Sequence, residues 1–359
     1  MGQSPSSKNY TENPEDMVLI QGNADLSNGK IKPRLFTTEI TKKSIKNDII
    51  LTVRAPVGDL AINEHDACIG RGVCAIRSGN NKFVYYLLEN IKRKHIWERL
   101  SQGSTFESIN SDDIKNLKIN IPSLLEQYKI ANFLTKIDEK IDLLEKTLVQ
   151  YEKYLNESIS KFTKKENNMW IPKEKWKKFK IRDLLKEFNQ KTETNNQYPL
   201  LSSTKEKIIL QEDYFNKQIA SKDNTGYKIL LKNQIVLSPQ NLWLGNINLN
   251  EEFEIGIVSP SYKIYDIKEK IDKNYLKFII KTPRMLYLYA TISEQGASVV
   301  RRNLNQKLFN ELIIELPPIK DQKIIADFLN SISLKISLIE VKIEKNKEFK
   351  KFLLQNMFV

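Results

Sequence analysis

The sequence predicts an α+β protein made of two copies of one unit, each a mixed α and β globular domain followed by a long helix. The first observation is a repeat: Ile121–Leu134 returns 195 residues later as Leu316–Leu329, with Pro, Gln, Ile, Ala, Phe and Leu at identical offsets. The second is a regular apolar pattern that follows each copy, and the third is a group of short β-type segments that precedes each copy. Together they indicate an internal duplication.

The repeat extends far upstream of the two helices. Lys46–Leu51 matches Lys232–Leu237, and Gly58 follows the first segment as Gly245 follows the second. A chance similarity between two helices would not extend through the preceding domain, so the whole unit is duplicated.

Short segments rich in β-branched and aromatic residues and bounded by Gly, Pro, Asn and Asp predict strands in both globular halves. Two longer segments, Lys82–Leu100 and Lys273–Leu288, have helical spacing with charges on the outer face. The predicted strands are Ile49–Val53, Val73–Ile76, Ile229–Leu231, Ile235–Leu237 and Tyr262–Tyr265.

Apolar residues at alternating spacings of four and three predict a coiled-coil seam in each long helix. Each helix leaves one domain and must end beside the other, so we expect an antiparallel pair within one chain. Homodimerisation through parallel coils is the alternative. The predicted pairing residues are Ile130, Leu134, Ile137, Ile141, Leu144 and Leu148 in the first helix and Ile325, Leu329, Ile332, Ile336, Ile339 and Ile343 in the second.

We expect four consecutive parts: a first domain over residues 1–120, a first helix over 121–165, a second domain over 166–315 and a second helix over 316–359. A chain of 359 residues has room for two domains that each bury a core. The net charge of +13, concentrated in the second half, fits a partner with a phosphate backbone. Compositional bias toward Lys is the simpler alternative.

The motifs that the sequence lacks reduce the number of functions that it could have. Two cysteines and two histidines, with no Cys-x-x-Cys pair, favour a reducing cytoplasm and predict neither a disulfide framework nor a metal site. No apolar run is long enough to cross a bilayer, and no methyltransferase or phosphate-loop motif is present. We therefore expect a chain without catalytic residues or a cofactor.

The duplicated pattern Pro-x-x-x-Glu/Asp-Gln-x-x-Ile-Ala-x-Phe-Leu at the entry to each long helix resembles the conserved regions of the specificity (S) subunits of type I restriction-modification enzymes. Gly2–Ser7, Leu19–Asn23 and Asp48–Gly58 are similar to segments of a target-recognition domain of that family. The resemblance covers essentially the whole chain in the order domain, helix, domain, helix.

The resemblance implies two mixed α/β target-recognition domains, each reading one part of a split, asymmetric site in double-stranded DNA, with the paired helices setting the gap. It also implies two methyltransferase (M) subunits as partners, which methylate adenine, and restriction/translocase (R) subunits. None of that chemistry would reside in this chain.

One departure from the family pattern concerns the first domain. The second domain begins with Trp170–Leu185, which looks like the family's domain opening, whereas the first half starts directly at the Gly-Gln-Ser-Pro segment. We expect the first domain to lack its opening segment, through truncation, a downstream start or recombination.

Major-groove reading uses Arg or Lys for guanine and Asn or Gln for adenine, presented on loops and helix ends. Each candidate has an alternative role as a solvated surface side chain. The predicted DNA-contacting residues are Gln3, Ser4, Lys8, Gln21, Asn23, Arg34, Arg54 and Arg71 in the first domain and Lys205, Lys228, Gln240, Asn241, Arg301 and Arg302 in the second.

Two functions from other classes remain open at this point. A non-catalytic coiled-coil scaffold with a non-specific basic surface would form a symmetric dimer and bind no methyltransferase subunit. A self-sufficient DNA-modifying enzyme would transfer methyl groups without a partner.

Overall fold

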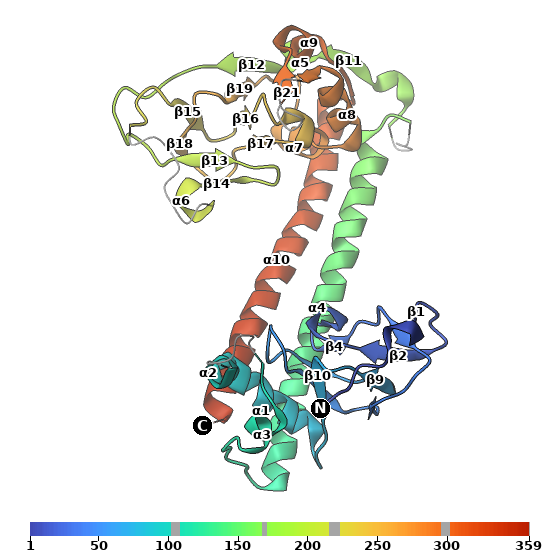
Figure 1. Ribbon diagram of the computed structural model, residues 1–359. Helices are drawn as coiled ribbons and strands as arrows, with labels where there is room; N and C mark the ends of the chain where they lie inside the picture. The colour runs from blue at the N-terminus through green and yellow to red at the C-terminus, as the bar shows by residue number, and fades with distance from the viewer. Residues whose placement is uncertain (102–107, 167–170, 215–222, 296–301, 359) are drawn as a thin grey trace. The chain divides into compact units, whose positions relative to one another are not determined.

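The computed structural model describes residues 1–101, 108–166, 171–214, 223–295 and 302–358, and the chain divides into two compact units (Figure 1). The first unit holds Met1–Lys146 together with Glu340–Val359, and the second holds Thr147–Ile339. Each unit therefore contains one globular domain and parts of both long helices, α4 (Leu124–Thr163) and α10 (Ile319–Met357).

The described strands of the first unit form two five-stranded sheets, with strand orders β1-β5-β2-β9-β6 and β10-β7-β8-β4-β3. β7 is buried along its whole length, as its run of Ile, Ile, Leu and Thr predicts for a central strand. The strands are β1 (Tyr10–Thr11), β2 (Met17–Ile20), β3 (Leu26–Ser27), β4 (Lys30–Ile31), β5 (Phe36–Thr37), β6 (Lys43–Ser44), β7 (Ile49–Thr52), β8 (Leu60–Ile62), β9 (Ala67–Ile69) and β10 (Val73–Ile76).

The segment Lys82–Leu100 is helical as predicted, but two helices occupy it in place of one continuous helix. α1 (Asn81–Arg93) starts at Asn80, whose side chain accepts a hydrogen bond from the Phe83 amide. It ends before His95, whose left-handed backbone (φ 55°) interrupts the helical path. The other helices of this domain are η1 (Ser7–Asn9), η2 (Asn23–Asp25), α2 (Ile96–Ser101) and α3 (Ser111–Lys115).

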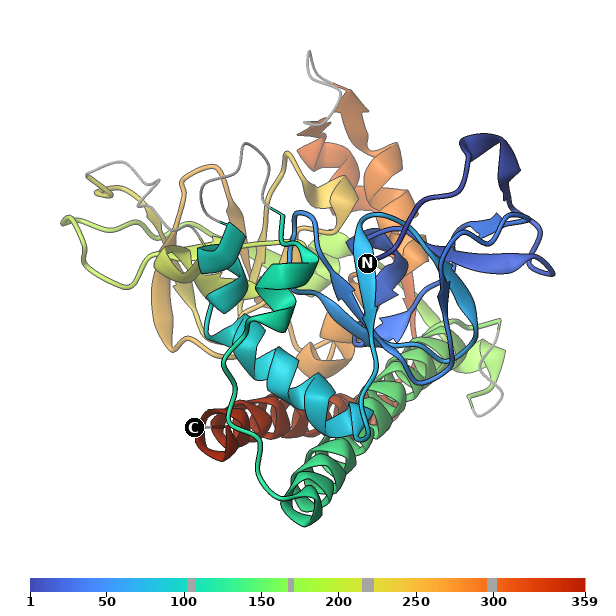
Figure 2. The ribbon, with the colours of Figure 1, turned by 60° about the horizontal axis from the view of Figure 1, so that its bottom comes forward.

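The C-terminal end of α10 completes the core of the first unit. Leu354 and Phe358 are buried with Phe83, Trp97 and Leu134 in one apolar cluster. The Phe358 carbonyl also accepts a hydrogen bond from the Asn90 side chain on α1 (3.2 Å), and Figure 2 shows α1 beside α4 and the end of α10. The core of this unit thus joins chain segments that are more than 200 residues apart in sequence.

Lys350 lies on α10 where the apolar pattern of the second helix is interrupted, and its ammonium group contacts two carboxylates. Its Nζ is 2.9 Å from Glu89 on α1 and 2.9 Å from Asp138 on α4, and the Tyr86 hydroxyl donates to Asp138. Burial alone would lower the pKa of Lys350, but the two carboxylates raise it above its ordinary value. In the same unit, Lys347 pairs with Glu145. From Lys347 to Lys350 the chain advances along α10, whereas the partner on α4 moves back from Glu145 to Asp138, so these two helical segments are antiparallel.

The second unit is built around a four-stranded sheet of order β12-β19-β16-β17, beside strand pairs β11-β22, β13-β14, β15-β18 and β20-β21. The strands are β11 (Lys177–Lys180), β12 (Leu185–Phe188), β13 (Leu201–Ser203), β14 (Ile208–Leu210), β15 (Lys228–Leu231), β16 (Ile235–Leu237), β17 (Ile247–Leu249), β18 (Ile255–Val258), β19 (Lys263–Ile267), β20 (Ser293–Gln295), β21 (Arg302–Leu304) and β22 (Ile313–Leu316).

The segment Lys273–Leu288 is also helical as predicted but divided into two helices, because Pro283 lacks an amide hydrogen and starts a new helix. Tyr275, Tyr289 and Phe309 form the fully buried centre of the core, against which Phe162 of α4 and Leu329 of α10 pack. The helices are η3 (Lys173–Lys175), α5 (Ile181–Leu184), α6 (Gln211–Tyr214), η4 (Leu242–Leu244), α7 (Lys273–Ile279), α8 (Pro283–Thr291) and α9 (Gln306–Glu311).

A glutamine that both copies of the repeat share anchors the start of each long helix. Gln127 Nε2 donates to the Pro122 carbonyl (3.0 Å), and Gln322 Nε2 donates to the Pro317 carbonyl (2.9 Å). Gln322 Oε1 also accepts a hydrogen bond from the Asp272 amide. The side chain therefore joins the helix to the preceding extended segment, and in the second unit also to the start of α7.

The duplication is visible in backbone geometry as well as in sequence. Asn47 and Asn233 both adopt left-handed conformations (φ 72° and 68°), and the amide of each donates at 2.7 Å to an asparagine carbonyl, that of Asn63 or Asn250. Gly58 and Gly245 also match (φ 94° and 92°). The predicted α+β class with an internal duplication and two long helices is confirmed.

The predicted pairing residues all lie within α4 and α10. Leu134, Ile137, Ile141, Ile325, Leu329, Ile332, Ile339 and Ile343 are buried, whereas Ile130, Leu144, Leu148 and Ile336 are half-buried. No helix among the described residues is long and apolar enough to span a membrane.

Candidate nucleic-acid interface

The turn between β9 and β10 organises the candidate surface of the first unit. A methyl group on Gly72 would lie only 2.0 Å from the carbonyl oxygen of Gln21, so the turn and the end of β2 can approach only with glycine at this position. On the other side, the Arg71 amide donates to the Ser4 hydroxyl (3.1 Å) and the Val53 amide donates to the Gly72 carbonyl (2.9 Å). Three loops distant in sequence are thereby held together.

Asp25 fixes a second part of this surface. Its buried carboxylate accepts the amides of Gln21 (2.8 Å) and Gly22 (3.2 Å) and the Nε of Arg34 (2.9 Å). Half of the Arg34 side chain stays exposed. One carboxylate thus holds the backbone at Gln21 and the side chain of Arg34, and exposed Asn23 lies between these two candidates in sequence.

Most first-domain candidates therefore belong to one group of loops, which we call the first loop cluster. Gln3 joins it because its amide donates to the Ile69 carbonyl just before the turn, and exposed Arg54 follows Val53. Lys8 differs, because it lies in η1 near Glu39, where its charge helps to lower the pKa of that carboxyl after the hydrogen bonds from Asn9 and Ser6. The first loop cluster is Gln3, Ser4, Gln21, Asn23, Arg34, Arg54 and Arg71.

In the second unit the candidates converge on η4 and β21. The guanidinium carbon of Arg302 lies 4.2 Å from the centre of the Trp243 ring, and the Arg302 amide donates to the Gln240 carbonyl (3.2 Å). Gln240 is exposed and Asn241 is half-buried beside it. Adjacent Arg301 lies outside the described residues.

Lys205 lies at the other end of η4. A methyl group on Gly245 would be 4.0 Å from Cγ of Lys205, whose side chain is exposed. Lys205, Gln240, Asn241 and Arg302 form what we call the second loop cluster. Lys228 lies in a different neighbourhood on β15, where its ammonium group donates to the Tyr262 carbonyl (2.6 Å) and burial lowers its pKa.

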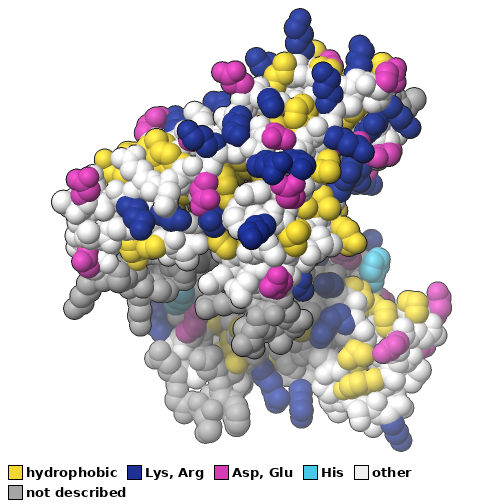
Figure 3. Space-filling model, turned by 90° about the horizontal axis from the view of Figure 1, so that it is seen from above, with side chains coloured by type: hydrophobic (Ala, Val, Ile, Leu, Met, Phe, Trp, Pro, Cys, Tyr) yellow, Lys and Arg dark blue, Asp and Glu magenta, His cyan; other side chains and the backbone are white. Residues whose placement is uncertain are grey.

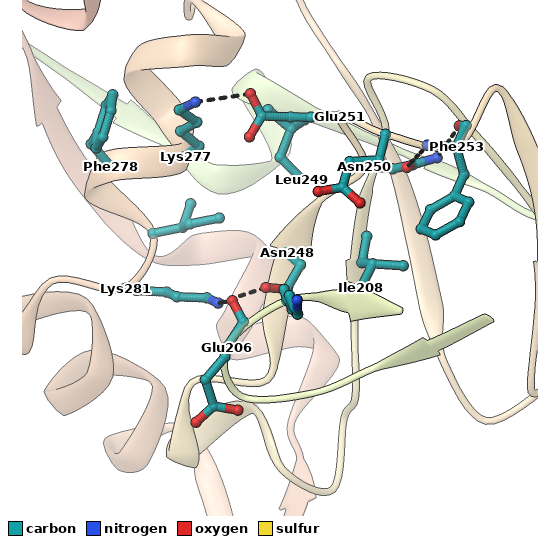
Figure 4. A pocket seen from close by; sticks show the side chains of 13 residues that line it. Glu206, Ile208, Asn248, Leu249, Asn250, Glu251, Phe253, Lys277, Phe278 and Lys281 are labelled. Atoms are coloured by element: carbon teal, nitrogen blue, oxygen red, sulfur yellow. Dashed lines mark hydrogen bonds and ion pairs between the residues drawn. The ribbon is translucent and has the colours of Figure 1, made fainter. Parts of the chain in front are cut away.

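A cleft of about 280 Å³ is lined by Glu206, Asn248 and Lys281, among other residues (Figure 4). Lys281 is one of the lining residues, and its Nζ donates to the carbonyls of Lys205 (2.8 Å) and Glu206 (3.0 Å) and to Asn248 Oδ1 (2.6 Å). Burial lowers the pKa of Lys281 to about 8. This lysine therefore tethers the loop of the second cluster to the end of α7.

Lys and Arg side chains also spread over the face of the second unit that carries α5, α9 and β11 (Figure 3). Lys180 and Arg182 share Glu311 as a partner, whereas Lys177, Lys178 and Lys186 are exposed nearby in sequence. Among the described residues, no group of three or more His, Cys, Asp or Glu side chains could hold a metal ion. Cys68 and Cys74 are buried, and burial raises the pKa of Cys74 to about 11.

The family model for the type I restriction modification DNA specificity domain matches residues 1–153 and again residues 173–347. The chain belongs to this family. The predicted resemblance is thereby confirmed for both halves of the chain.

Curated members of this DNA specificity family support the assignment in part of the chain. Over 157 residues, 43% of this chain, it is 40% identical to a Methanocaldococcus jannaschii protein assigned as the type I restriction enzyme MjaX specificity subunit, covering 36% of that protein. It is also 32% identical over 100 residues, 27% of this chain, to the MjaIX specificity subunit of the same organism, covering 23% of it. The matches span about a third or less of these relatives.

Two solved structures share the fold of this specificity-domain chain. A type I restriction-modification S subunit from M. genitalium superposes with a TM-score of 0.60 at 17% identity, covering 100% of this chain and 92% of that one. A chain from a structure described as the basis of complex assembly and conformational transition of the type I R-M system gives 0.56 at 14% identity, covering 95% and 91%.

Sequence reasoning missed several residues that position the candidate surfaces of this family member. Asp25 and Lys281 resemble ordinary surface charges in the sequence, and their partners are loop groups that only the fold brings near them. Trp243 offered a signal, since an aromatic residue a few positions after Gln240 and Asn241 can support an arginine.

Proposed function

We propose that the chain is a DNA sequence-specificity subunit of a type I restriction-modification complex, with each domain reading one half of a bipartite, asymmetric site. The first loop cluster would read one half and the second loop cluster the other. The domain limits that we propose are residues 1–120 and 166–315, with helical spacers over 121–165 and 316–359.

The observation that carries the proposal is that Arg54 and Gln240, two candidate base-reading side chains, stand at the same position of the two repeats. Arg54 follows β7 and Gln240 follows β16, and each loop is framed by a matched asparagine before the strand and a matched glycine after it. A common framework with different side chains is the arrangement that two readers of different half-sites require.

The side chains in the clusters suit major-groove recognition. Arg54, Arg71 and Arg302 could each donate two hydrogen bonds to guanine, while Gln21 and Gln240 could bind the adenine edge. Lys205 and the exposed lysines near β11 are suited to phosphate contacts, which give affinity but no sequence preference.

The partners that we propose follow from family membership. Two M subunits would methylate adenine and R subunits would cleave or translocate DNA, while this chain supplies neither catalytic residues nor a cofactor. The curated relatives are named as specificity subunits of restriction enzymes, which supports a role inside such a complex. We expect the assembly to act in the cytoplasm.

The test is to express the chain with its companion methyltransferase subunit in a host without adenine methylation and to map N6-methyladenine along the genome. We expect methylation at a split motif with a fixed gap, and exchange of residues 166–315 for those of another specificity subunit should change one half of it only. No methylation, together with a symmetric dimer that binds no methyltransferase subunit, would favour the scaffold function instead.

A further inference from the structure

Two arginines of the first unit are each paired with a buried aspartate. The side chains of Asp25 and Asp48 are only 3% and 2% exposed, whereas those of their partners Arg34 and Arg77 are 50% and 58% exposed. In each pair an anion inside the unit holds a cation at the surface. The two pairs lie at different places in the unit, and this difference indicates a different role for each arginine.

The Asp25 carboxylate joins Arg34 to the loop that follows β2. Its Oδ2 atom accepts the amides of Gln21 (2.8 Å) and Gly22 (3.2 Å), and its Oδ1 atom accepts Nε of Arg34 (2.9 Å). One oxygen thus holds the loop and the other holds the guanidinium group. The position of this group is thereby fixed relative to the backbone of Gln21.

The backbone is also held on both sides of Arg34. The Lys32 amide donates to the Asp25 carbonyl (2.7 Å), and the Leu19 amide on β2 donates to the Leu35 carbonyl (2.9 Å). The side chain therefore extends from a restrained backbone and is restrained again at its Nε atom. Little of its conformational entropy is left to be lost when a ligand binds.

The outer nitrogens of Arg34 are left for a ligand. Neither Nη atom has a hydrogen-bond partner among the described residues. The two Nη groups donate in one plane, and they match the O6 and N7 acceptors that guanine presents in the major groove. A phosphate contact needs a charge but no fixed plane, and lysine provides it as a point charge. A guanidinium group whose plane is set before binding is therefore suited to reading a base.

We propose that Arg34 reads a guanine in the half-site bound by the first domain, and that Asp25 is the positioning residue for Arg34. The inference rests on the proposed function and adds the identity of one base pair to it. The bond from Nε to the carboxylate sets the plane in which the two Nη groups donate. Because the same carboxylate holds the backbone of Gln21, a candidate reader of adenine, the two base readers keep a constant spacing.

The pair of Asp48 and Arg77 supplies a matched control. Arg77 donates to Asp48 from Nε (2.7 Å) and from Nη2 (2.8 Å). β7 and β10 pair in antiparallel fashion, and Asp48 and Arg77 lie at one end of this strand pair. Arg54 and Arg71 of the first loop cluster lie at the other end. Arg77 therefore has a similar partner and similar exposure but lies away from the candidate surface.

The experiment uses the complex of the full chain with its companion methyltransferase subunit. The split motif of the unchanged complex is determined first, and the first half-site is the part that exchange of residues 166–315 leaves unaltered. Methylation rates are then measured on duplexes that carry each base pair in turn at each position of this half-site. The preference for guanine at a position is the ratio of these rates.

Arg34→Lys keeps the charge but not the planar pair of donors. We expect it to lower the preference for guanine at one position by on the order of tenfold. Asp25→Asn should lower the preference at the same position, because one amide oxygen replaces two carboxylate oxygens and the attraction to the cation is lost. Asp25→Glu moves the anion by one methylene group and is the second variant for this test. Arg77→Lys should leave every base preference unchanged.

A guanine analogue with carbon in place of N7 tests the contact directly. At the position identified above, it should slow methylation by the unchanged complex by on the order of tenfold and have little effect on the Arg34→Lys complex. Equal slowing of both complexes would overturn the assignment of Arg34 to this base.

The remaining outcomes separate this inference from the proposed function. A first half-site made only of A·T pairs would overturn the inference and leave the proposed function intact. An equal loss on all duplexes in Arg34→Lys would overturn it as well, since Arg34 would then contact phosphate. Unchanged preferences in both Asp25 variants would exclude the positioning role. No methylation by the unchanged complex would contradict the proposed function, and the inference with it.

Discussion

Arg302 stacks on Trp243, with its guanidinium carbon 4.2 Å from the centre of the ring. Its Nε atom is buried without a hydrogen-bond partner among the described residues, so the ring holds the planar group, while the Gln240 carbonyl holds the backbone of Arg302. An arginine fixed in this way is oriented before it meets a ligand, which lowers the entropy lost on binding.

Replacing Arg302 with alanine should weaken binding to the cognate DNA by ~1–3 kcal/mol if the side chain reads a base. The loss should disappear when the half-site read by the second domain is already mismatched, as measured by titration of paired duplexes. Lys307→Ala removes an equal charge from exposed α9 and is the control. An equal loss on every duplex would instead identify Arg302 as a phosphate contact.

Replacing Trp243 with leucine should reduce the same affinity while leaving the Arg302 side chain present. The expected loss is ~1 kcal/mol, the value typical of a partly exposed cation–π contact. Combining Trp243→Leu with Arg302→Ala should cost little more than Arg302→Ala alone, since the two residues act together. Strictly additive losses in this double-mutant cycle would contradict the coupling.

Replacing Lys350 with leucine should destabilise the first unit by ~3 kcal/mol, because Glu89 and Asp138 would lose their shared cation in a largely buried setting. The measurement is urea unfolding of the full chain. Lys347→Leu breaks an exposed pair with Glu145 and should cost less than ~1 kcal/mol. Equal costs for both variants would show that the Lys350 contacts contribute little.

Acid should destabilise the first unit partly through Asp48. Burial would raise the pKa of this carboxyl, but hydrogen bonds from Arg77, the Ile45 amide and Ser44 hold it below its ordinary value. Because the folded pKa is depressed, the carboxylate stabilises the fold above the ordinary aspartate pKa of ~3.9, and this contribution is lost as the pH falls through the lower folded value. The free energy of unfolding, measured between about pH 5 and about pH 2, should therefore depend less on pH in Asp48→Asn than in the unchanged chain.

The second repeat offers a natural comparison for that variant. Gln234 occupies the position of Asp48 and donates to Asp266 (2.7 Å), so a neutral amide is already compatible with this fold. A variant Asp48→Asn that failed to fold at neutral pH would contradict this reasoning.

Replacing Gln322 with leucine should cost more than replacing Gln127 with leucine. Gln322 is 1% exposed and bridges the Pro317 carbonyl and the Asp272 amide, whereas Gln127 is half-buried and bonds to the Pro122 carbonyl. We expect ~2 kcal/mol for the first and ~1 kcal/mol for the second, since unpaired buried groups carry the larger penalty. Urea unfolding of the two variants measures the difference, and a reversed order would exclude this account.

The repeat and the heptad spacing were sufficient to predict the two long helices, because both signals are local in sequence. The helix breaks were missed for local reasons too: His95 adopts a conformation unusual for its residue type, and Pro283 was overlooked within an otherwise helical pattern. Lys350 places a charge in the predicted apolar seam. The carboxylate of Glu89 neutralises this charge, and the sequence could not predict the contact because the two residues are 261 positions apart.

The candidate surfaces were predicted unevenly for similar reasons. Gln240, Asn241 and Arg302 were predicted to contact DNA because of their residue types, and they do lie together in the structure. Lys228 met the same criterion, but its ammonium group is engaged by the Tyr262 carbonyl within the domain. Charge and spacing cannot distinguish these cases, because the difference lies in whether the fold supplies an internal acceptor.

The matched left-handed positions Asn47 and Asn233 have an evolutionary consequence. An asparagine pair fixes the backbone at the start of β7 and of β16, and neither Arg54 nor Gln240 takes part in these hydrogen bonds. Under the proposed function, a substitution at either position would change the sequence preference of one domain and leave the asparagine framework of that domain in place.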